Sequence, residues 1–275
     1  MNSQPNEAQY RLGFLGAGKL AGSVIRGLIR AKFSSPNEII ASDPNEQARV
    51  MLRDAFAVNV TTENTKVAKN AKVIFIGVKP ALVLPVLREL HVDLVSKVVI
   101  SLAAGVRLKN MESVSNARFM RALANTPSAI CHAATAIARG TRTTNEDVAL
   151  AQKIFSAIGI VVEVEEEQID VVTALTGSGP AFIYTVIEAL AAGGVKMGLG
   201  SSVALTLATQ TVLGAAQLAR ETQLSPDDLR NMVVTPGGTT AAGLEAMKRL
   251  GTSESLIAAI EAATKRGQEM ARGNL

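Results

Sequence analysis

A glycine- and threonine-rich stretch in the last third of the chain combines groups that could bind a small anion. Thr235, Gly237, Gly238, Thr239 and Thr240 lie in TPGGTTAAGLEAM, directly ahead of a strongly helical run. A bare turn that opens a helix presents unpaired N–H groups and the positive end of the helix dipole. The same residues also suit a plain turn with a threonine cap, so their types alone leave both interpretations open.

A second glycine-rich stretch, near the N-terminus, has the spacing of a dinucleotide-binding loop. Gly16, Gly18 and Ala21 form a G-x-G-x-x-A pattern in GFLGAGKLA, between a predicted strand and a predicted helix. Gly16 permits a tight turn, Gly18 lets the backbone approach a pyrophosphate, and Ala21 allows the helix to pack closely on the sheet. The pattern predicts nucleotide binding at the start of this helix.

Two other strand ends carry side chains suited to the same ligand. The predicted strand 38–42 ends at Ser42 and Asp43. A carboxylate there suits the ribose hydroxyls of NAD, whereas a hydroxyl or a cation suits the 2′-phosphate of NADP. We expect Asp43, which precedes Pro44, to point away and leave Ser42 to meet a 2′-phosphate, which favours NADPH. The strand 72–78 runs into Lys79, which places a cation at the carboxyl edge of the sheet, where ligands bind.

Other catalytic chemistry finds little support in the residue types. Cys131 and His132 are neighbours in a predicted strand, so their side chains point to opposite faces and cannot form a dyad. With two histidines and one cysteine in the chain, no metal site stands out. No serine has the spacing of a nucleophile elbow. These observations argue against hydrolysis and metal chemistry and favour redox chemistry carried by a bound cofactor.

The composition excludes several classes of partner. Aromatic residues make up 3% of the chain, with no tryptophan, too few to stack on single-stranded nucleic acid. The net charge of +4 comes from scattered residues rather than a basic run. The opening MNSQPNEAQYR lacks the pattern of a signal peptide, and no apolar run reaches membrane-spanning length. With a single cysteine, we expect a soluble cytoplasmic protein.

The chain divides into two parts of different character. Apolar runs at 11–18, 38–42, 72–78 and 97–105 alternate with amphipathic segments at 20–31 and 44–55, and further strands are expected at 117–123, 133–139 and 158–165. This alternation predicts an α/β fold, a parallel sheet with helices on both faces. Beyond residue 165 every signal is helical and apolar on more than one side, which indicates a subunit interface. We therefore predict a nucleotide-binding domain over 1–165 and a helical dimerisation domain over 166–275.

Six segments, in order along the whole chain, carry a family resemblance. They are GFLGAGKLA, GVKPALV, SLAAGV, RALANTP, LTGSGPAFIYTVIEALAAGGVKMGL and VTPGGTTAAGLEAM. Together they closely resemble pyrroline-5-carboxylate reductase, the last enzyme of proline biosynthesis. The resemblance implies a Rossmann domain followed by a helical domain that intertwines with a partner subunit, in a homodimer or a ring of dimers. It also implies an active site between the nicotinamide and the helical domain.

The same resemblance assigns the cofactor and substrate residues. The substrate would lie on the turn from Thr235 to Thr240, and Gly177, Ser178 and Pro180 would face Asn125 and Pro127. NADP, with NAD as the alternative, would contact Gly16, Gly18, Lys19, Leu20, Ser42, Asn64, Val78, Lys79, Pro80 and Ala104, with Asn125 and Pro127 near the nicotinamide.

The turn then acquires a chemical purpose. Pyrroline-5-carboxylate is a cyclic imine with one carboxylate, which the N–H groups around Gly238 and Thr239 would hold. The Thr240 hydroxyl would bond the ring nitrogen while hydride adds to the C=N carbon. Little acid–base machinery is needed if the imine enters protonated, because positioning and electrostatics suffice.

Two other functions fit parts of the pattern. A β-hydroxyacid dehydrogenase also joins such a glycine loop to a helical domain, but it needs a lysine where this chain has the stretch 177–183, which contains none. A non-catalytic dinucleotide-sensing protein would leave the threonine-rich turn without a purpose. Turnover of the imine would distinguish the reductase from the sensor.

Overall fold

The computed structural model describes residues 9–272, so the N-terminal segment in which no signal peptide was expected lies largely outside it. The described chain forms two compact units. One comprises residues up to Gly177 together with those from Ala263, and the other comprises Ser178–Ala262. Residues 166–177 and those from Ala263 onward therefore belong to the compact unit that contains the sheet. The predicted domain boundary at residue 165 stays a prediction.

The first unit is built on an eight-stranded sheet in the order β3-β2-β1-β4-β5-β6-β7-β8. Buried, nearly continuous apolar runs form the central strands, as expected where both faces of a parallel sheet are covered. The strands are β1 (Tyr10–Leu15), β2 (Ile39–Ser42), β3 (Asn59–Thr61), β4 (Ala71–Ile76), β5 (Val98–Ser101), β6 (Arg118–Leu123), β7 (Ala133–Arg139) and β8 (Gly159–Glu163).

The predicted α/β fold and its seven strands are confirmed, with two differences. The three-residue strand β3 was not predicted, because a run as short as Asn59–Thr61 shows no clear period. The β6–β7 pair is antiparallel, whereas all the other pairs are parallel. A parallel connection needs a crossover of a dozen or more residues, and the short 3₁₀ turn Thr126–Ile130 between β6 and β7 is not long enough.

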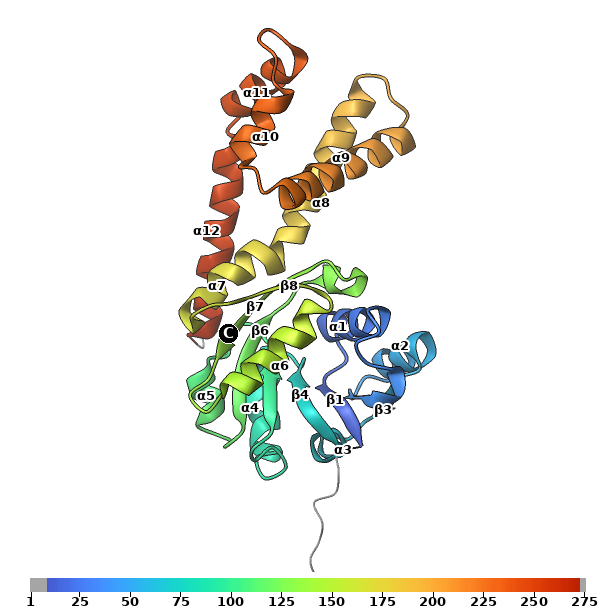
Figure 1. Ribbon diagram of the computed structural model, residues 1–275, viewed down its shortest axis with the longest axis vertical. Coiled ribbons are helices and arrows are strands. Elements are labelled where there is room, and N and C mark those ends of the chain that lie inside the picture. The colour runs from blue at the N-terminus through green and yellow to red at the C-terminus, as the bar shows by residue number, and fades with distance from the viewer. Residues whose placement is uncertain (1–8, 273–275) are drawn as a thin grey trace, which may run out of the picture. The chain divides into compact units, whose positions relative to one another are not determined.

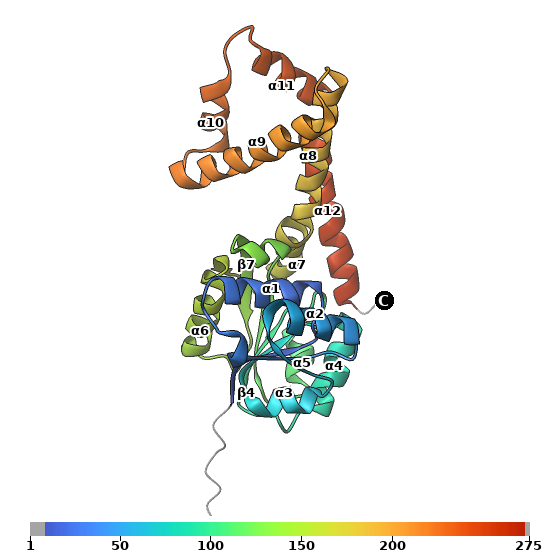
Figure 2. The same cartoon turned by 90° about the vertical axis from the view of Figure 1, so that its right-hand side faces the viewer.

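Helices cover both faces of the sheet (Figures 1 and 2). One core lies under α1 (Lys19–Arg30), α2 (Glu46–Phe56) and α6 (Asn145–Ser156), and contains a stacked pair of rings, Phe14 and Phe75, with centroids 4.6 Å apart. The other core lies under three shorter helices, and a fourth, α7, covers β7. These are α3 (Asn64–Asn70), α4 (Pro80–Glu89), α5 (Leu108–Glu112) and α7 (Ile169–Val172).

The second unit is helical, as predicted, but buries very little. Among its residues, all of which the structure describes, the buried cluster consists of Ala191, Ala204 and Ala208, with Ile187 packed against it. Large apolar side chains along its helices are exposed, so this unit requires a partner to cover them. Its helices are α8 (Gly179–Lys196), α9 (Ser201–Thr222), α10 (Pro226–Val233), α11 (Thr239–Arg249) and the first part of α12 (Thr252–Ala271).

Two helical stretches are long and apolar enough, by length and composition, to cross a membrane: Glu166–Lys196 and Ser201–Thr222. The expectation that no run reaches that length is therefore wrong. It considered only the apolar run around α8, whereas the helix continues back through a π-helical segment, Thr173–Ser178, to α7. Such exposed apolar helices are equally what a subunit interface requires.

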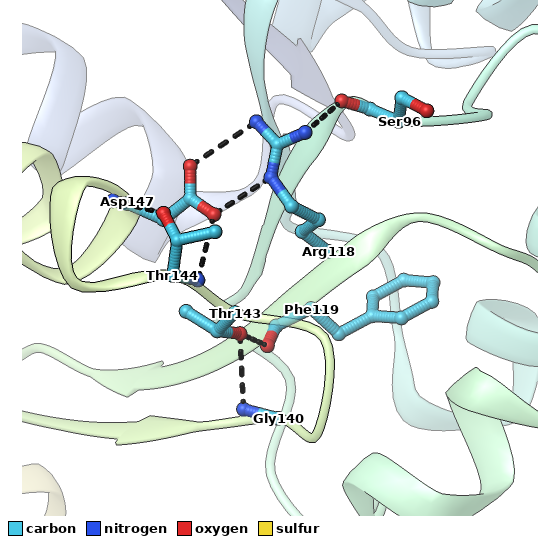
Figure 3. Close-up of polar contacts among 7 residues, drawn as sticks. All are labelled: Ser96, Arg118, Phe119, Gly140, Thr143, Thr144 and Asp147. Atoms are coloured by element: carbon cyan, nitrogen blue, oxygen red, sulfur yellow. Dashed lines mark hydrogen bonds and ion pairs between the residues drawn. The ribbon is translucent and has the colours of Figure 1, made fainter.

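An ion pair at the amino edge of the sheet joins β6 to α6 (Figure 3). Arg118 donates from Nε to Asp147 Oδ2 at 2.6 Å and from Nη2 to Asp147 Oδ1 at 3.1 Å, and its Nη1 donates to the Ser96 carbonyl. Thr144 and Asp147 cap α6 reciprocally. Burial alone would raise the pKa of Asp147, but the Arg118 guanidinium and the groups of Thr144 outweigh it and lower that pKa below its ordinary value.

We predict that Asp147→Asn lowers the free energy of unfolding by about 2 kcal/mol at pH 7, because it removes a charged hydrogen-bond acceptor from a largely buried site. Since the folded-state pKa of Asp147 is lowered, its carboxylate stabilises the fold above about pH 4, and this contribution disappears as the pH falls through the folded-state pKa. Urea unfolding at fixed protein concentration should therefore show the variant and the original chain converging in acid.

Asp54→Asn is the matched control. Asp54 pairs with Arg53 at 2.8 Å, but both side chains are about 60% exposed, so the change should cost less than about 1 kcal/mol. An equal loss of unfolding free energy in both variants would show that burial does not increase the contribution of the Arg118–Asp147 pair.

Candidate active site

The carboxyl edge of the parallel strands gathers most of the residues that were predicted to bind a cofactor. The parallel strands β1, β2, β4, β5 and β6 all end at this edge. Their ends place there the glycine loop, Ser42, Val78, Lys79, Pro80, Ala104, Asn125 and Pro127, while Lys19 and Leu20 open α1 and Asn64 opens α3. The edge is where open α/β sheets bind their ligands.

The glycine loop lies in close backbone contact with the neighbouring strand end. Gly16 has a φ of +95°, and a Cβ added to it would meet the Gly77 carbonyl carbon at 2.7 Å. Its N–H donates to the Ser42 carbonyl at 2.8 Å. Gly18 precedes α1 and has no side-chain cap. Among the described residues other than its chain neighbours, an added Cβ would meet only the Gly77 carbonyl oxygen, at an ordinary contact distance of 3.8 Å. The loop therefore leaves room for a phosphate at free N–H groups.

Ser42 and Asp43 both make hydrogen bonds to other protein groups. The Ser42 side chain is fully buried, and its hydroxyl donates to Asn64 Oδ1 at 2.7 Å. Asp43 does not point away. Its Oδ2 accepts from the Ala17 N–H and its Oδ1 from the Asn45 N–H, both at 2.8 Å. The expectation that Asp43 points away was wrong, because it considered only the order of residues along the strand and not the backbone donors that meet there. The assignment of Ser42 to the cofactor stays a prediction.

Arg49, which the sequence interpretation overlooked, brings a cation to the end of β2. From the second turn of α2, its Nη1 donates to the carbonyls of Asp43 at 2.6 Å and Pro44 at 2.9 Å. Its Nε and Nη2 have no hydrogen-bond partner among the described residues. An arginine shortly after the second strand is a known sign of 2′-phosphate binding, and this signal was available in the sequence.

Asn125 acts as a bridge rather than as an open contact. It is 8% exposed, its Oδ1 accepts from the Ala134 N–H, and its Nδ2 donates to the Thr176 carbonyl, each at 3.0 Å. Thr176 lies in the π-helical segment Thr173–Ser178, a conformation found disproportionately at functional sites. Asn125 thus connects β7 with this segment at the carboxyl edge of the sheet.

Two ion pairs hold the residues just before this π-helical segment, one from the start of α5 and one from β6. Arg107 donates to Asp170 Oδ2 at 2.8 Å, and Arg121 donates to Glu166 Oε1 at 3.2 Å. Burial lowers the pKa of Arg121, although Glu166 and Asp170 oppose that shift. The segment from Glu166 to Ser178 is therefore held at both of its ends.

Cys131 and His132 are not in a strand, so the strand argument against a dyad was wrong. Cys131 ends the 3₁₀ turn with a left-handed φ of +62°, and its half-buried thiol donates to the Gly27 carbonyl at 3.6 Å. His132 Nδ1 lies 2.8 Å from the Ile130 carbonyl. The two side chains therefore interact with different backbone carbonyls.

The predicted substrate turn opens α11 in the second unit. Gly237 has a φ of +71°, and the Gly238 N–H donates to the Thr235 carbonyl at 3.0 Å, so Gly238 cannot offer that N–H to a ligand. Gly238 is also the helix cap, and no side chain caps this end. The interpretation of Thr240 as a capping residue therefore finds no support.

The first turn of α11 leaves donors available. The first N–H along this helix to pair with a helix carbonyl is that of Ala242, which donates to Gly238. The N–H groups of Thr239, Thr240 and Ala241 precede it, and no acidic side chain lies in the first turn. Thr240 is half-buried, and its hydroxyl makes no hydrogen bond among the described residues. The turn can therefore receive a carboxylate and offer one hydroxyl beside it.

The chain is similar to proteins of known activity over nearly its whole length. The family described as pyrroline-5-carboxylate reductase dimerisation matches residues 166–270, and NADP oxidoreductase coenzyme F420-dependent matches 11–105. A pyrroline-5-carboxylate reductase of Arabidopsis thaliana is 39% identical, covering 96% of each chain. The structure of such an enzyme from Coxiella burnetii is 34% identical, with a TM-score of 0.87, covering 96% of this chain and 99% of that one.

A solved structure with a cofactor is also similar. The pyrroline carboxylate reductase of Plasmodium falciparum, crystallised with NADP bound, is 26% identical and has a TM-score of 0.87, covering 97% of this chain and all of that one. The similarity to these structures extends over both compact units.

We predict that the two loop glycines fail in different ways when replaced by alanine. Gly18→Ala should leave the thermal midpoint nearly unchanged, because an added Cβ meets no protein atom closer than 3.8 Å, yet it should weaken nicotinamide-dinucleotide binding, because the methyl group occupies the space for the phosphate. Gly16→Ala should lower both, because its Cβ would overlap the backbone of Gly77 and its φ is positive. Calorimetric titration and thermal unfolding measure the two effects, and unimpaired binding by Gly18→Ala would exclude the loop as the phosphate site.

Proposed function

The chain belongs to the pyrroline-5-carboxylate reductase family, and from this premise we propose how its own residues bind cofactor and substrate. The reaction of this family is the NAD(P)H-dependent reduction of 1-pyrroline-5-carboxylate to proline, and the chain is such an oxidoreductase with an NADP-binding domain. The residue assignments rest on one observation: the backbone N–H groups at the start of α1, in the glycine loop, and at the start of α11 have no side chain that caps them.

The glycine loop suits the pyrophosphate of the dinucleotide. The N–H groups at the start of α1 have no side-chain cap, no acidic residue lies in that turn, and the space in front of Gly18 is open. When bound, the reduced dinucleotide supplies the hydride. Val78, Lys79, Pro80 and Ala104 lie along the same edge, and the exposed Lys79 ammonium adds a positive charge there.

We assign the 2′-phosphate of NADP to Arg49 instead of Ser42. Arg49 is anchored through Nη1 at the end of β2, which leaves Nε and Nη2 to meet a phosphate in a fixed orientation. Asp43 engages its carboxylate with backbone N–H groups and so has less capacity to accept from the ribose hydroxyls of NAD. Both features favour NADPH over NADH.

We assign the substrate to the turn from Thr235 to Thr240. The N–H groups of Thr239 and Thr240 would receive the carboxylate at the positive end of α11, while Gly238 maintains the turn through its bond to Thr235. The Thr240 hydroxyl would contact the ring nitrogen, whose electron density changes as the C=N bond is reduced. No group with acid–base chemistry is required at the turn if the imine enters protonated.

The chain carries the dimerisation region of its family and forms a homodimer. We also propose that dimers assemble further into a ring. Exposed side chains at the ends of helices in the second unit support this, namely Met197 at 85% and Leu250 at 78%. A cytoplasmic location is proposed as well, since a single cysteine is typical of a reducing compartment.

The activity is tested by mixing the purified chain with pyrroline-5-carboxylate and each reduced cofactor and following nicotinamide absorbance. Oxidation of NADPH that depends on the imine is the expected result. A folded protein that binds the dinucleotide without turnover would instead be a dinucleotide sensor.

Arg49→Ala should raise the dissociation constant for NADPH by about tenfold to a hundredfold and leave that for NADH nearly unchanged, because a charged hydrogen bond to a phosphate contributes about 1.5–3 kcal/mol. Titration with both cofactors measures this ratio. Arg53→Ala is the control, since Arg53 lies one turn further along α2 and pairs with Asp54. Equal losses for the two cofactors would show that Arg49 only maintains the loop.

Thr240→Val removes the hydroxyl and keeps the shape of the side chain. We expect turnover to fall by about a hundredfold, or about 3 kcal/mol, with a smaller change in KM, if the bond to the ring nitrogen strengthens in the transition state. Thr239→Val is the control, because its proposed role uses the backbone N–H, which the substitution retains. Full turnover by a Thr240→Val protein that is less stable would show that Thr240 has only a structural role.

A further inference from the structure

Strand β8 is the last strand of the sheet and carries apolar side chains on both faces. Side chains alternate between faces along a strand. Val161 packs against the core under α1, α2 and α6. Ile160 and Val162 point to the opposite face, where they are 58% and 51% exposed. Branched apolar residues on both faces are typical of a strand that is covered on both sides.

The cover on that face ends one strand earlier. Ile160 pairs with Ala134 and Val162 with Ala136 of β7, so these residues share a face. On β7, Ala136 and Ala138 are buried in one apolar cluster with Ile169 of α7. The two side chains of β8 beside them remain exposed, and no helix of the described part of this unit covers them.

The exposed apolar surface continues onto the segment that covers β7. Val171 is 46% exposed and Leu175 is 59% exposed. Arg121 of β6 and Arg107 at the start of α5 form ion pairs with this segment, and Ile169 at its start packs on β7. Val171 and Leu175 also lie in the region that matches the dimerisation family, which begins at residue 166. The surface therefore runs from the family's dimerisation region onto the sheet.

We propose that the dimer interface extends onto the sheet, with apolar helix surface from a second copy of the chain covering Ile160, Val162, Val171 and Leu175. Continuity with the dimerisation region identifies the occupant. The rim has the polar character usual at subunit interfaces, since Arg139 Nε donates to Glu163 Oε1 at 2.5 Å at the end of β8. The rim also carries Glu165, Glu166 and Glu167, which an anionic lipid surface would repel.

This contact would make the cofactor-binding sheet part of the dimer. The helices of the second unit bury only three alanines and a partly buried isoleucine among themselves, so they depend on a partner for their core. If the interface also includes β8, the partner subunit would cover part of the sheet in addition to these helices.

Thiol reactivity in the native dimer tests the proposal with two matched positions. Val162 and Val95 are the same residue type and are 51% and 52% exposed, but Val95 lies in the turn before β5, at the amino edge of the sheet. In a Cys131→Ser background, we expect the thiol of Val162→Cys to react at least about tenfold more slowly than that of Val95→Cys, because only the former must wait for the dimer to open.

Sedimentation at the same concentration establishes that each labelled protein is a dimer, and reductase activity establishes that it is folded. Equal rates at the two positions in a dimer would overturn the proposal, as would protection that appears only in assemblies larger than the dimer. Ile160→Cys serves as the second reporter should Val162→Cys not fold. Independently, Val162→Lys should raise the dimer dissociation constant by at least about tenfold, and Val95→Lys should not, because only the first charge would enter an apolar contact.

Discussion

The close approach of Gly16 to Gly77 is the constraint on which the cofactor edge depends. A side chain on Gly16 would overlap the Gly77 backbone, and a Cβ on Gly77 would meet the Cβ of Ala21 at 2.9 Å. These three positions therefore set how closely β1, β4 and α1 can pack. Because α1 begins directly above this contact, its free N–H groups lie at the edge of the sheet rather than over a face. The other residues predicted to bind the cofactor can meet the same ligand only if the glycine loop lies at this edge of the sheet.

The residues predicted to bind ligands, in both compact units, include polar groups that maintain the structure and polar groups that remain available. Ser42, Asp43, Asn125 and the Gly238 N–H are all engaged with other protein groups. Arg49 retains unpaired nitrogens, and Thr240 retains its hydroxyl. An engaged group is costly to divert because its partner would lose a hydrogen bond in a buried setting. The available groups are therefore the better candidates for ligand contacts.

The helical unit depends on association in a way that the sheet unit does not. The sheet unit encloses two large apolar cores, one on each face. The helical unit buries only Ala191, Ala204 and Ala208, although its helices are rich in leucine, isoleucine and valine. Its membrane-like composition follows from this, because a helix that is covered by another subunit is apolar on more than one side. Hydropathy alone cannot distinguish a protein partner from lipid, whereas the family match identifies a dimerisation region.

The sequence by itself determined the features that local pattern controls. The period of apolar residues identified seven of the strands, and the G-x-G-x-x-A spacing identified the loop, because both reflect contacts between near neighbours. Six motifs in order along the chain, among them TPGGTT and ANTP, together indicated the family. Tertiary structure alone decided the use of each polar group. Ser42 and Asp43 meet Asn64 and Ala17, partners 22 and 26 residues away, and no local rule predicts such pairs. The bridge from Asn125 to the π-helical segment likewise joins residues that are 51 positions apart.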